Sequence, residues 1–171
     1  SIFFENQIKR IHLFTVGVGN VGGKLLDQIK QQQSYLLDKR HIDIRVIALA
    51  NSKKMLFNEE GIDLKKWHEV LLNNGEPADL DLFYKKTRQL NLRNSVFVDN
   101  TANYEVPDQY SKYLKDSVAV VACNKIACSS EIENYKNLKF LARKYNAPFL
   151  FETNVGAGLP MIDTLNNLIA S

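Results

Sequence analysis

The sequence predicts an α/β fold in which a doubly wound parallel sheet carries helices on both of its faces. Two observations lead to this prediction. Apolar runs of strand length recur along the 171 residues, and stretches with apolar residues at helical spacing separate them. A glycine-rich turn also joins the first strand to the first helix. Strands that alternate with helices in this way are typical of a parallel sheet covered on both faces.

The amino-terminal part predicts a βαβ unit. Residues 8–16 are rich in β-branched and aromatic side chains and lead directly into Gly17, as a buried strand entering a tight turn does. From Asn20 to about Gln33 the apolar residues recur at helical spacing, which predicts a helix that opens where the glycines end. Residues 42–50 predict the second strand, which completes the unit.

The rest of the chain predicts a crossover and three further strands. The stretch 53–94 is more polar and predicts two amphipathic helices, one containing Trp67 and the other Phe83. A final helix is expected to start at Pro160. Between residue 94 and Pro160, strands are expected at residues 95–99, 117–122 and 148–151, and helices near 107–115 and 130–145.

Composition and charge exclude several classes of partner. The 22 Lys and Arg exceed the 19 Asp and Glu by an excess too small and too scattered for the basic field that nucleic acid or an anionic membrane requires. The apolar runs are also far shorter than the roughly 20 residues of a membrane helix. The spacing of Cys123 and Cys128 fits neither zinc nor a redox pair. Reduced thiols in a cytoplasmic protein are favoured over a local disulfide.

The motif Gly17-Val18-Gly19-Asn20-Val21-Gly22 is a complete G-x-G-x-x-G between a predicted strand and a predicted helix. Gly17 permits a tight turn, Gly19 lets the backbone approach a pyrophosphate, and Gly22 lets the helix and the strand pack closely. The phosphates would meet the amides and the positive dipole end of that helix. The motif in this context predicts a Rossmann-type dinucleotide-binding domain, against the alternative of a glycine turn without a ligand.

The end of the second strand predicts a preference for NADP over NAD. NAD-specific sites usually carry an acid there for the ribose 2′-hydroxyl, but the chain reads Ala50-Asn51-Ser52-Lys53-Lys54. A carboxylate would repel a 2′-phosphate, whereas Ser52 and the lysines could hydrogen-bond to it and neutralise it. The alternative is a solvated pair of loop lysines.

Polar residues follow two later strands. Asp99-Asn100-Thr101-Ala102-Asn103 is dense in short polar side chains, which cap helices and also line nucleotide pockets. Thr101 is expected either to reach the nicotinamide side of the cofactor or to cap a helix. Lys125 closes the next strand, where a site at the carboxyl end of a sheet needs a donor or a cation.

A glycine turn at residues 152–160 leaves the last strand. Glycines 156 and 158 free carbonyl groups that, with the Glu152 region, could coordinate a hard cation through oxygen. The residues alone favour a plain strand-to-helix turn. The three histidines are dispersed along the chain and assemble neither a metal site nor a catalytic relay.

At these segments the sequence resembles homoserine dehydrogenase, particularly the dehydrogenase portion of bifunctional aspartokinase/homoserine dehydrogenases. The resemblance covers nearly the whole chain. It is carried by Gly17-Val18-Gly19-Asn20-Val21-Gly22-Gly23, residues 42–46 with Ala50-Asn51-Ser52-Lys53, Val98-Asp99-Asn100-Thr101, Asn124-Lys125, and the highly specific Glu152-Thr153-Asn154-Val155-Gly156-Ala157-Gly158-Leu159-Pro160.

The resemblance implies reversible oxidation of homoserine to aspartate semialdehyde with a nicotinamide cofactor, in the pathway to threonine and methionine. It also implies a set of contacts by matching position. Cofactor contacts would fall on Gly19, Asn20, Val21, Thr101 and Lys125, with Lys125 also near the substrate as the catalytic candidate. A sodium site would be formed, largely through backbone carbonyls, by Glu152, Val155, Ala157 and Leu159.

The same resemblance implies an incomplete enzyme. Residues 1–151 would form the cofactor-binding domain and residues 152–171 the start of the substrate domain, while the acids and the lysine that hold substrate and move its proton lie beyond Ser171 in this family. We therefore expect cofactor binding without turnover, and homo-oligomers in the full-length parent. The alternatives are a non-catalytic nucleotide-sensing module on the same fold and a dehydrogenase of another semialdehyde or 2-hydroxy acid.

Overall fold

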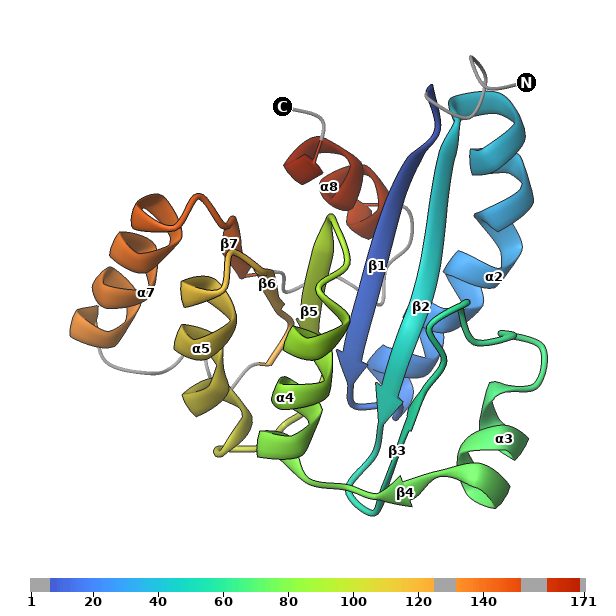
Figure 1. Cartoon of the computed structure of the whole chain (residues 1–171), viewed down its shortest axis with the longest axis horizontal. Coiled ribbons are helices and arrows are strands. Elements are labelled where there is room, and N and C mark those ends of the chain that lie inside the picture. Colours follow the sequence, from blue (N-terminus) through green and yellow to red (C-terminus); the bar gives the residue numbers. More distant parts are fainter. Residues whose placement is uncertain (1–6, 125–131, 152–159, 170–171) are drawn as a thin grey trace.

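Figure 1 shows a computed structural model of the chain, which describes residues 7–124, 132–151 and 160–169. At its centre lies a seven-stranded sheet with the order β4-β3-β2-β1-β5-β6-β7. The strands are β1 (Lys9–Val16), β2 (Ile42–Ala50), β3 (Lys54–Phe57), β4 (Glu76–Pro77), β5 (Ser95–Asp99), β6 (Ala119–Ala122) and β7 (Phe149–Phe151). The five neighbouring strands β2, β1, β5, β6 and β7 are parallel, which confirms the predicted α/β class.

Two short strands at one edge were not predicted. β3 runs antiparallel to β2 and β4 runs antiparallel to β3, within the stretch where the sequence indicated helices alone. Residues 51–53 form the turn of a hairpin, in which the amide of Asn51 donates to the carbonyl oxygen of Lys54 (2.9 Å). The sheet is therefore mixed at this edge and parallel elsewhere.

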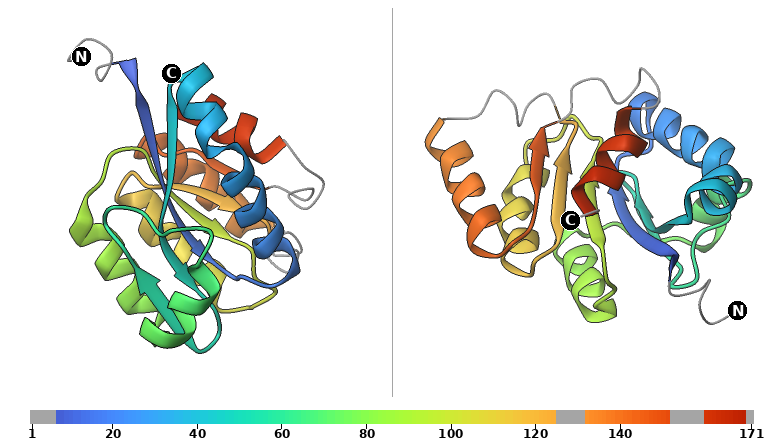
Figure 2. Two further views of the ribbon diagram at one scale, coloured as in Figure 1. Left: turned by 90° about the vertical axis from the view of Figure 1, so that its right-hand side faces the viewer. Right: turned by 90° about the horizontal axis from the view of Figure 1, so that it is seen from above.

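Helices cover both faces of the sheet (Figure 2). α2 (Asn20–Arg40) and α8 (Pro160–Ile169) lie on one face. α4 (Leu80–Leu90), the 3-10 helix η1 (Val106–Gln109), α5 (Tyr110–Lys115) and α7 (Ile132–Lys144) lie on the other, while α3 (Trp67–Asn74) lies beside β3. This arrangement confirms the predicted layers.

Alternating side chains of the strands divide the core in two. In β5, Val96 and Val98 pack into the cluster that holds Leu25 of α2 and Leu165 of α8. Phe97 between them points to the opposite face, where its ring stacks on Tyr113 at 4.0 Å between centroids. Because both faces are buried, the central strands read as continuous apolar runs, which is why their positions were visible in the sequence.

Helix α2 runs to Arg40, seven residues beyond the expected end at Gln33. Leu36 is buried against the sheet and Lys39 and Arg40 occupy the last turn, where cations interact favourably with the helix dipole. His41 ends the helix in a left-handed conformation (φ 58°). Within the described residues, no helix is long and apolar enough to cross a membrane.

Candidate functional site

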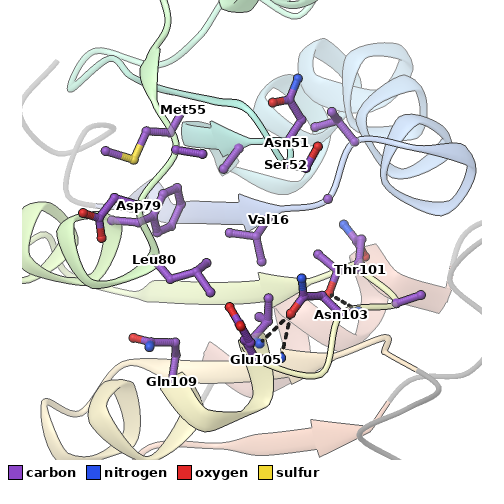
Figure 3. Close-up of a pocket in the computed structure, with 18 of the residues that line it drawn as sticks. Val16, Asn51, Ser52, Met55, Asp79, Leu80, Thr101, Asn103, Glu105 and Gln109 are labelled. Carbon is purple, nitrogen blue, oxygen red and sulfur yellow. Dashed lines mark hydrogen bonds between the residues drawn. The ribbon is translucent and has the colours of Figure 1, made fainter.

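The parallel strands β1, β2 and β5 end at a cleft of about 1080 Å³ (Figure 3). Its floor is apolar and includes Val16, Met55 and Leu80. Its polar rim comes from four loops that follow different strands. The lining residues are Val16, Gly17, Val18, Gly19, Ala50, Asn51, Ser52, Met55, Ala78, Asp79, Leu80, Asp81, Phe83, Asn100, Thr101, Ala102, Asn103, Glu105, Val106, Asp108 and Gln109. Ligands of open α/β sheets bind at this edge, where the strand order reverses on the two sides of β1.

The predicted glycine turn lies in this cleft, and two of its glycines are required by the backbone. Gly17 has φ +90°, and a Cβ there would lie 2.8 Å from the carbonyl carbon of Asn100. A Cβ on Gly22 would lie 2.0 Å from the carbonyl oxygen of Gly17. Gly19 differs, because a Cβ there would meet nothing within 4 Å. The turn therefore packs tightly on its inner side and leaves open space at Gly19.

Helix α2 presents its amino terminus to this open space. Gly19 is the N-cap and provides no side-chain hydrogen bond, and the amide of Gly23 makes the bond to the Gly19 carbonyl that begins the helical pattern (2.7 Å). The amides of the first turn, which include those of Asn20 and Val21, have no intrahelical acceptor. The Val21 side chain is half-buried and packs against the core, and its backbone amide belongs to this first turn.

The loop after β2 brings Asn51 and Ser52 to the cleft but not Lys53. The Asn51 Oδ1 accepts hydrogen bonds from the amides of Lys53 (2.8 Å) and Lys54 (2.6 Å), which fixes the turn. Lys53 is exposed beside the cleft, and Lys54 points away from it because its ammonium donates to the carbonyl oxygen of Leu72. Of the two lysines, only Lys53 stays available for a phosphate at this corner.

Within the described residues the cleft lining contains no lysine or arginine, whereas it contains four carboxylates. Two of these are engaged by the protein. Asp79 accepts a hydrogen bond from the amide of Leu82 (3.0 Å) as the N-cap of α4. Asp81 pairs with the ammonium of Lys112 (2.9 Å), and this hydrogen bond lowers the pKa of the Asp81 carboxyl. An anion at the glycine turn would therefore be held mainly by hydrogen bonds from backbone amides.

The loop after β5 forms the opposite wall. The Thr101 hydroxyl donates to Oδ1 of Asp99 (2.7 Å) and accepts from Nδ2 of Asn124 (3.2 Å) and the amide of Asn103 (3.2 Å). A hydroxyl has one hydrogen to donate and two lone pairs, so all three are used within the protein. Thr101 lines the cleft, but its hydroxyl faces the protein, and its methyl carbon lies 3.0 Å from the Cβ position of Gly17.

Two buried polar residues of this wall were part of polar segments in the sequence but had no predicted role of their own. Asp99 and Asn124 are both fully buried. The Asp99 carboxylate accepts from the Tyr110 hydroxyl (2.5 Å) and from Nδ2 of Asn124 (3.1 Å), in addition to Thr101. Burial raises the pKa of the Asp99 carboxyl, and these hydrogen bonds act in the opposite direction. The only signal in the sequence was that each residue follows or closes a neighbouring parallel strand.

The residues of the cleft fit a dinucleotide. The apolar floor suits flat rings, and the open space at Gly19 lies where a pyrophosphate would approach the helix terminus. The side-chain oxygen of Asn100 is buried and has no hydrogen-bond partner among the described residues. An acceptor of this kind is costly unless something donates to it, and a bound ligand supplies donors.

Several predicted site residues lie outside the described part of the chain. These are the catalytic candidate Lys125 and the four expected sodium ligands Glu152, Val155, Ala157 and Leu159. Among the described residues, no three of the types His, Cys, Asp and Glu gather to hold a metal ion.

Solved structures share this fold at low sequence identity. A hyperthermophilic archaeal homoserine dehydrogenase in complex with NADPH is 20% identical, with a TM-score of 0.66 over 85% of this chain and 44% of its own. A homoserine dehydrogenase from Thermoplasma acidophilum is 17% identical, with a TM-score of 0.67 over 95% of this chain and 49% of its own. These similarities show the fold.

Comparison with known sequences identifies the family, through a family model that covers most of the chain. A bifunctional aspartokinase/homoserine dehydrogenase of Haemophilus influenzae is 42% identical over 166 residues, which are 97% of this chain and 20% of the relative. A chloroplastic bifunctional enzyme of Arabidopsis thaliana is 41% identical over 156 residues, which are 90% of this chain and 17% of the relative. The chain thus spans about a fifth of the length of these relatives. The family model for the NAD-binding domain of homoserine dehydrogenase matches residues 17–152, and the chain belongs to this family.

Proposed function

We propose that this chain is the cofactor-binding part of an NADP-preferring homoserine dehydrogenase, which interconverts homoserine and aspartate semialdehyde. One observation carries the proposal: the glycine turn faces the cleft at the strand ends, with open space at Gly19 and the amino terminus of α2 behind it. Relatives that are named as homoserine dehydrogenases support the choice of substrate.

The preference for NADP rests on the corner formed by Ser52 and Lys53. No carboxylate closes β2, and Ser52 lines the cleft beside the exposed Lys53. A 2′-phosphate at this corner gains a hydroxyl donor and one cation. The fold of the NADPH-bound archaeal enzyme is compatible with this assignment. Because the cleft lining holds several carboxylates and no lysine or arginine among the described residues, the charge of Lys53 matters more than that of an average surface lysine.

The bound nicotinamide supplies the hydride acceptor or donor. The chain itself binds and orients the cofactor: the glycine turn holds the diphosphate, the loop after β2 holds one ribose, and the loop after β5 forms the wall on the other side. Lys125, which directly follows Asn124 in the sequence, would contact cofactor and substrate. Positioning a substrate against the cofactor is the main contribution a protein makes to hydride transfer.

We also propose that this chain alone binds cofactor without turning it over, because the acids and the lysine that hold the substrate and move its proton would lie beyond Ser171, in a domain that would begin at residue 152. In the longer protein, Glu152, Val155, Ala157 and Leu159 would bind a sodium ion, and the subunits would form a homo-oligomer. The second candidate function is a nucleotide-sensing module, which the same cleft would serve.

Calorimetric titration with NADPH and NADH tests the cofactor assignment. We expect the unmodified chain to bind NADPH more tightly, and Lys53→Ala to weaken NADPH by about five- to tenfold while leaving NADH unchanged. Lys136→Ala removes the same charge from an exposed position on α7, at the far side of the sheet, and is the matched control. NADH binding at least as tight as NADPH, with no response to Lys53→Ala, would contradict the preference.

A second assay separates the enzyme from the sensor. The longer protein that contains this chain should reduce NADP+ when homoserine is added, whereas the chain alone should bind NADPH without any homoserine-dependent reduction. A longer protein that binds the cofactor but never reacts with homoserine would favour the sensing module.

A further inference from the structure

A buried polar network joins the carboxyl ends of β5 and β6. Its centre is the Asp99 carboxylate, whose Oδ1 accepts from the amide (2.8 Å) and the hydroxyl (2.7 Å) of Thr101. Its Oδ2 accepts from Tyr110 and Asn124. β5 and β6 are adjacent parallel strands with Asp99 opposite Ala122, so Asn124 follows β6 directly beside the end of β5. The network thus ties two consecutive strand ends together.

Asn124 lies behind the cleft lining and links the network to two lining residues, Thr101 and Asn103. Its Nδ2 lies within hydrogen-bond distance of three oxygens, namely Oδ2 of Asp99 (3.1 Å), Oγ1 of Thr101 (3.2 Å) and the carbonyl of Asn103 (2.9 Å). A carboxylate and a carbonyl accept only, so the amide group must present its nitrogen to them. Asn124 therefore holds the loop 100–103 at two points from the neighbouring strand.

The cost of burying these groups indicates that the network has a purpose beyond stability. Apolar side chains at such positions usually stabilise a fold as well as or better than a buried charge does. A fully satisfied polar network instead specifies one conformation, because any shift leaves a buried donor or acceptor without a partner. Here the specified segment is the loop that lines the cleft, which also includes Asn103, whose Oδ1 accepts from the amides of Glu105 (2.6 Å) and Val106 (3.3 Å) (Figure 3).

The position of this loop relates it to one half of the cofactor. The glycine turn follows β1, the loop with Ser52 follows β2 on one side of it, and the loop with Thr101 follows β5 on the other. A dinucleotide with its diphosphate at the glycine turn and its adenosine towards Ser52 extends its nicotinamide half along the loop 100–103.

We propose that Asn124 is a positioning residue that holds the wall formed by Thr101 and Asn103 against the nicotinamide half of the cofactor. The inference rests on the proposed function and goes beyond it, because Asn124 acts through the loop and from inside the protein. The two halves of the cofactor would then depend on different parts of the protein. The adenosine half depends on the loop after β2, and the nicotinamide half depends on the link between β5 and β6.

Two ligands distinguish the halves. NADPH occupies both, whereas 2′,5′-ADP reaches only the glycine turn and the corner at Ser52. Titrated into the 171-residue chain, Asn124→Ala should weaken NADPH by about tenfold or more while changing the affinity for 2′,5′-ADP by less than about twofold. Thr101→Val, which keeps the branched shape and removes the hydroxyl, should show the same split and carries the test if Asn124→Ala does not fold.

Asn94→Ala is the matched control. Asn94 donates from Nδ2 to the carbonyl oxygen of Arg10 (2.8 Å) just before β5, at the opposite end of the strand, and has φ 53°. The same substitution there removes a side-chain amide and destabilises the chain without touching the cleft, so both ligands should bind as in the unmodified chain.

The outcomes separate the two proposals. Equal affinity of the unmodified chain and Asn124→Ala for NADPH, or a parallel loss for NADPH and 2′,5′-ADP, overturns the role of Asn124 and leaves the proposed function standing. Failure of the unmodified chain to bind either ligand overturns the proposed function and this inference with it.

Discussion

The carbonyl oxygen of Gly17 lies 2.0 Å from the position that a Cβ on Gly22 would occupy. No side chain fits at that distance, so Gly17 and Gly22 meet through backbone alone. Both glycines of this pair are therefore needed to form the turn, whereas the glycine between them is needed only if something occupies the space in front of it.

Gly22→Ala should destabilise the chain and reduce cofactor binding together. The new methyl group forces the Gly17 carbonyl or the helix to move, and overpacking of this kind costs about 1–3 kcal/mol. Urea unfolding and NADPH titration measure the two effects. Gly23→Ala is the matched control, because the nearest atom to a Cβ there is 3.8 Å away. An unfolding free energy for Gly22→Ala equal to that of Gly23→Ala would contradict the close contact.

Gly19→Val should separate binding from stability. The valine side chain has room in the unliganded cleft, so the unfolding free energy should stay within about 1 kcal/mol of the unmodified chain. The same side chain occupies the space of the diphosphate, so both NADPH and NADH should bind at least about tenfold more weakly. Unchanged affinity for both cofactors would remove the phosphate-binding role of the turn.

Asp79→Asn and Asp79→Ala should have similar effects on NADPH binding and different effects on the stability of the chain. Both remove a negative charge from the lining, so both should bind NADPH at least as tightly as the unmodified chain does. Asparagine keeps an acceptor for the amide of Leu82, whereas alanine loses the N-cap of α4 at a cost of about 1 kcal/mol. Chemical denaturation compares the two variants, and a loss of stability in Asp79→Asn equal to that in Asp79→Ala would show that charge, not capping, is the contribution of this residue.

The buried imidazole of His12 should make the chain less stable in mild acid. Burial lowers the pKa of His12 below its ordinary value of 6.5, with Arg45 and Arg10 adding to the shift and the hydrogen bond with the Arg93 carbonyl and the Asp43 charge opposing it. The unfolded chain thus binds this proton more tightly than the folded chain does. The contribution of His12 to the free energy of unfolding is fully present well above pH 6.5. It is lost as the pH drops through 6.5 towards the folded pKa.

Urea unfolding at pH 7.5 and pH 5.5 measures this effect. His12→Gln, which keeps a donor for the Arg93 carbonyl, should flatten the change in unfolding free energy between the two pH values. His68→Gln removes an exposed imidazole on α3 and is the comparison. The same pH dependence in His12→Gln and in the unmodified chain would exclude His12 as its origin.

The sequence predicted those elements whose apolar residues form an unbroken run or recur at helical spacing. Residues 46–50 and 96–99 are buried on both faces, so the apolar runs that end at these residues coincide with β2 and β5. β3 and β4 escaped notice because they are only four and two residues long and lie at the edge of the sheet. The residues around β3 have apolar side chains at helical spacing, which led to the prediction of helices alone. The four residues of β3 form a strand because they pair with β2.

The site was predictable where one segment carries it and not where two segments meet. The glycine turn is contiguous, so its spacing alone located Gly17, Gly19 and Gly22. The pairing of Asp99 with Asn124 depends on the register between β5 and β6, which spacing along the chain does not contain. Likewise, the direction of the Lys54 side chain depends on the position of the last turn of α3, where the Leu72 carbonyl accepts from its ammonium.

The division between backbone and side chain around the cleft has an evolutionary consequence. Around Gly19 the protein offers main chain, which point mutations elsewhere leave in place, whereas the corner after β2 offers side chains that one or two substitutions can replace. Under the proposed function, an exchange of one coenzyme for the other would need substitutions only at residues 51–53 and would leave the main chain around Gly19 unchanged.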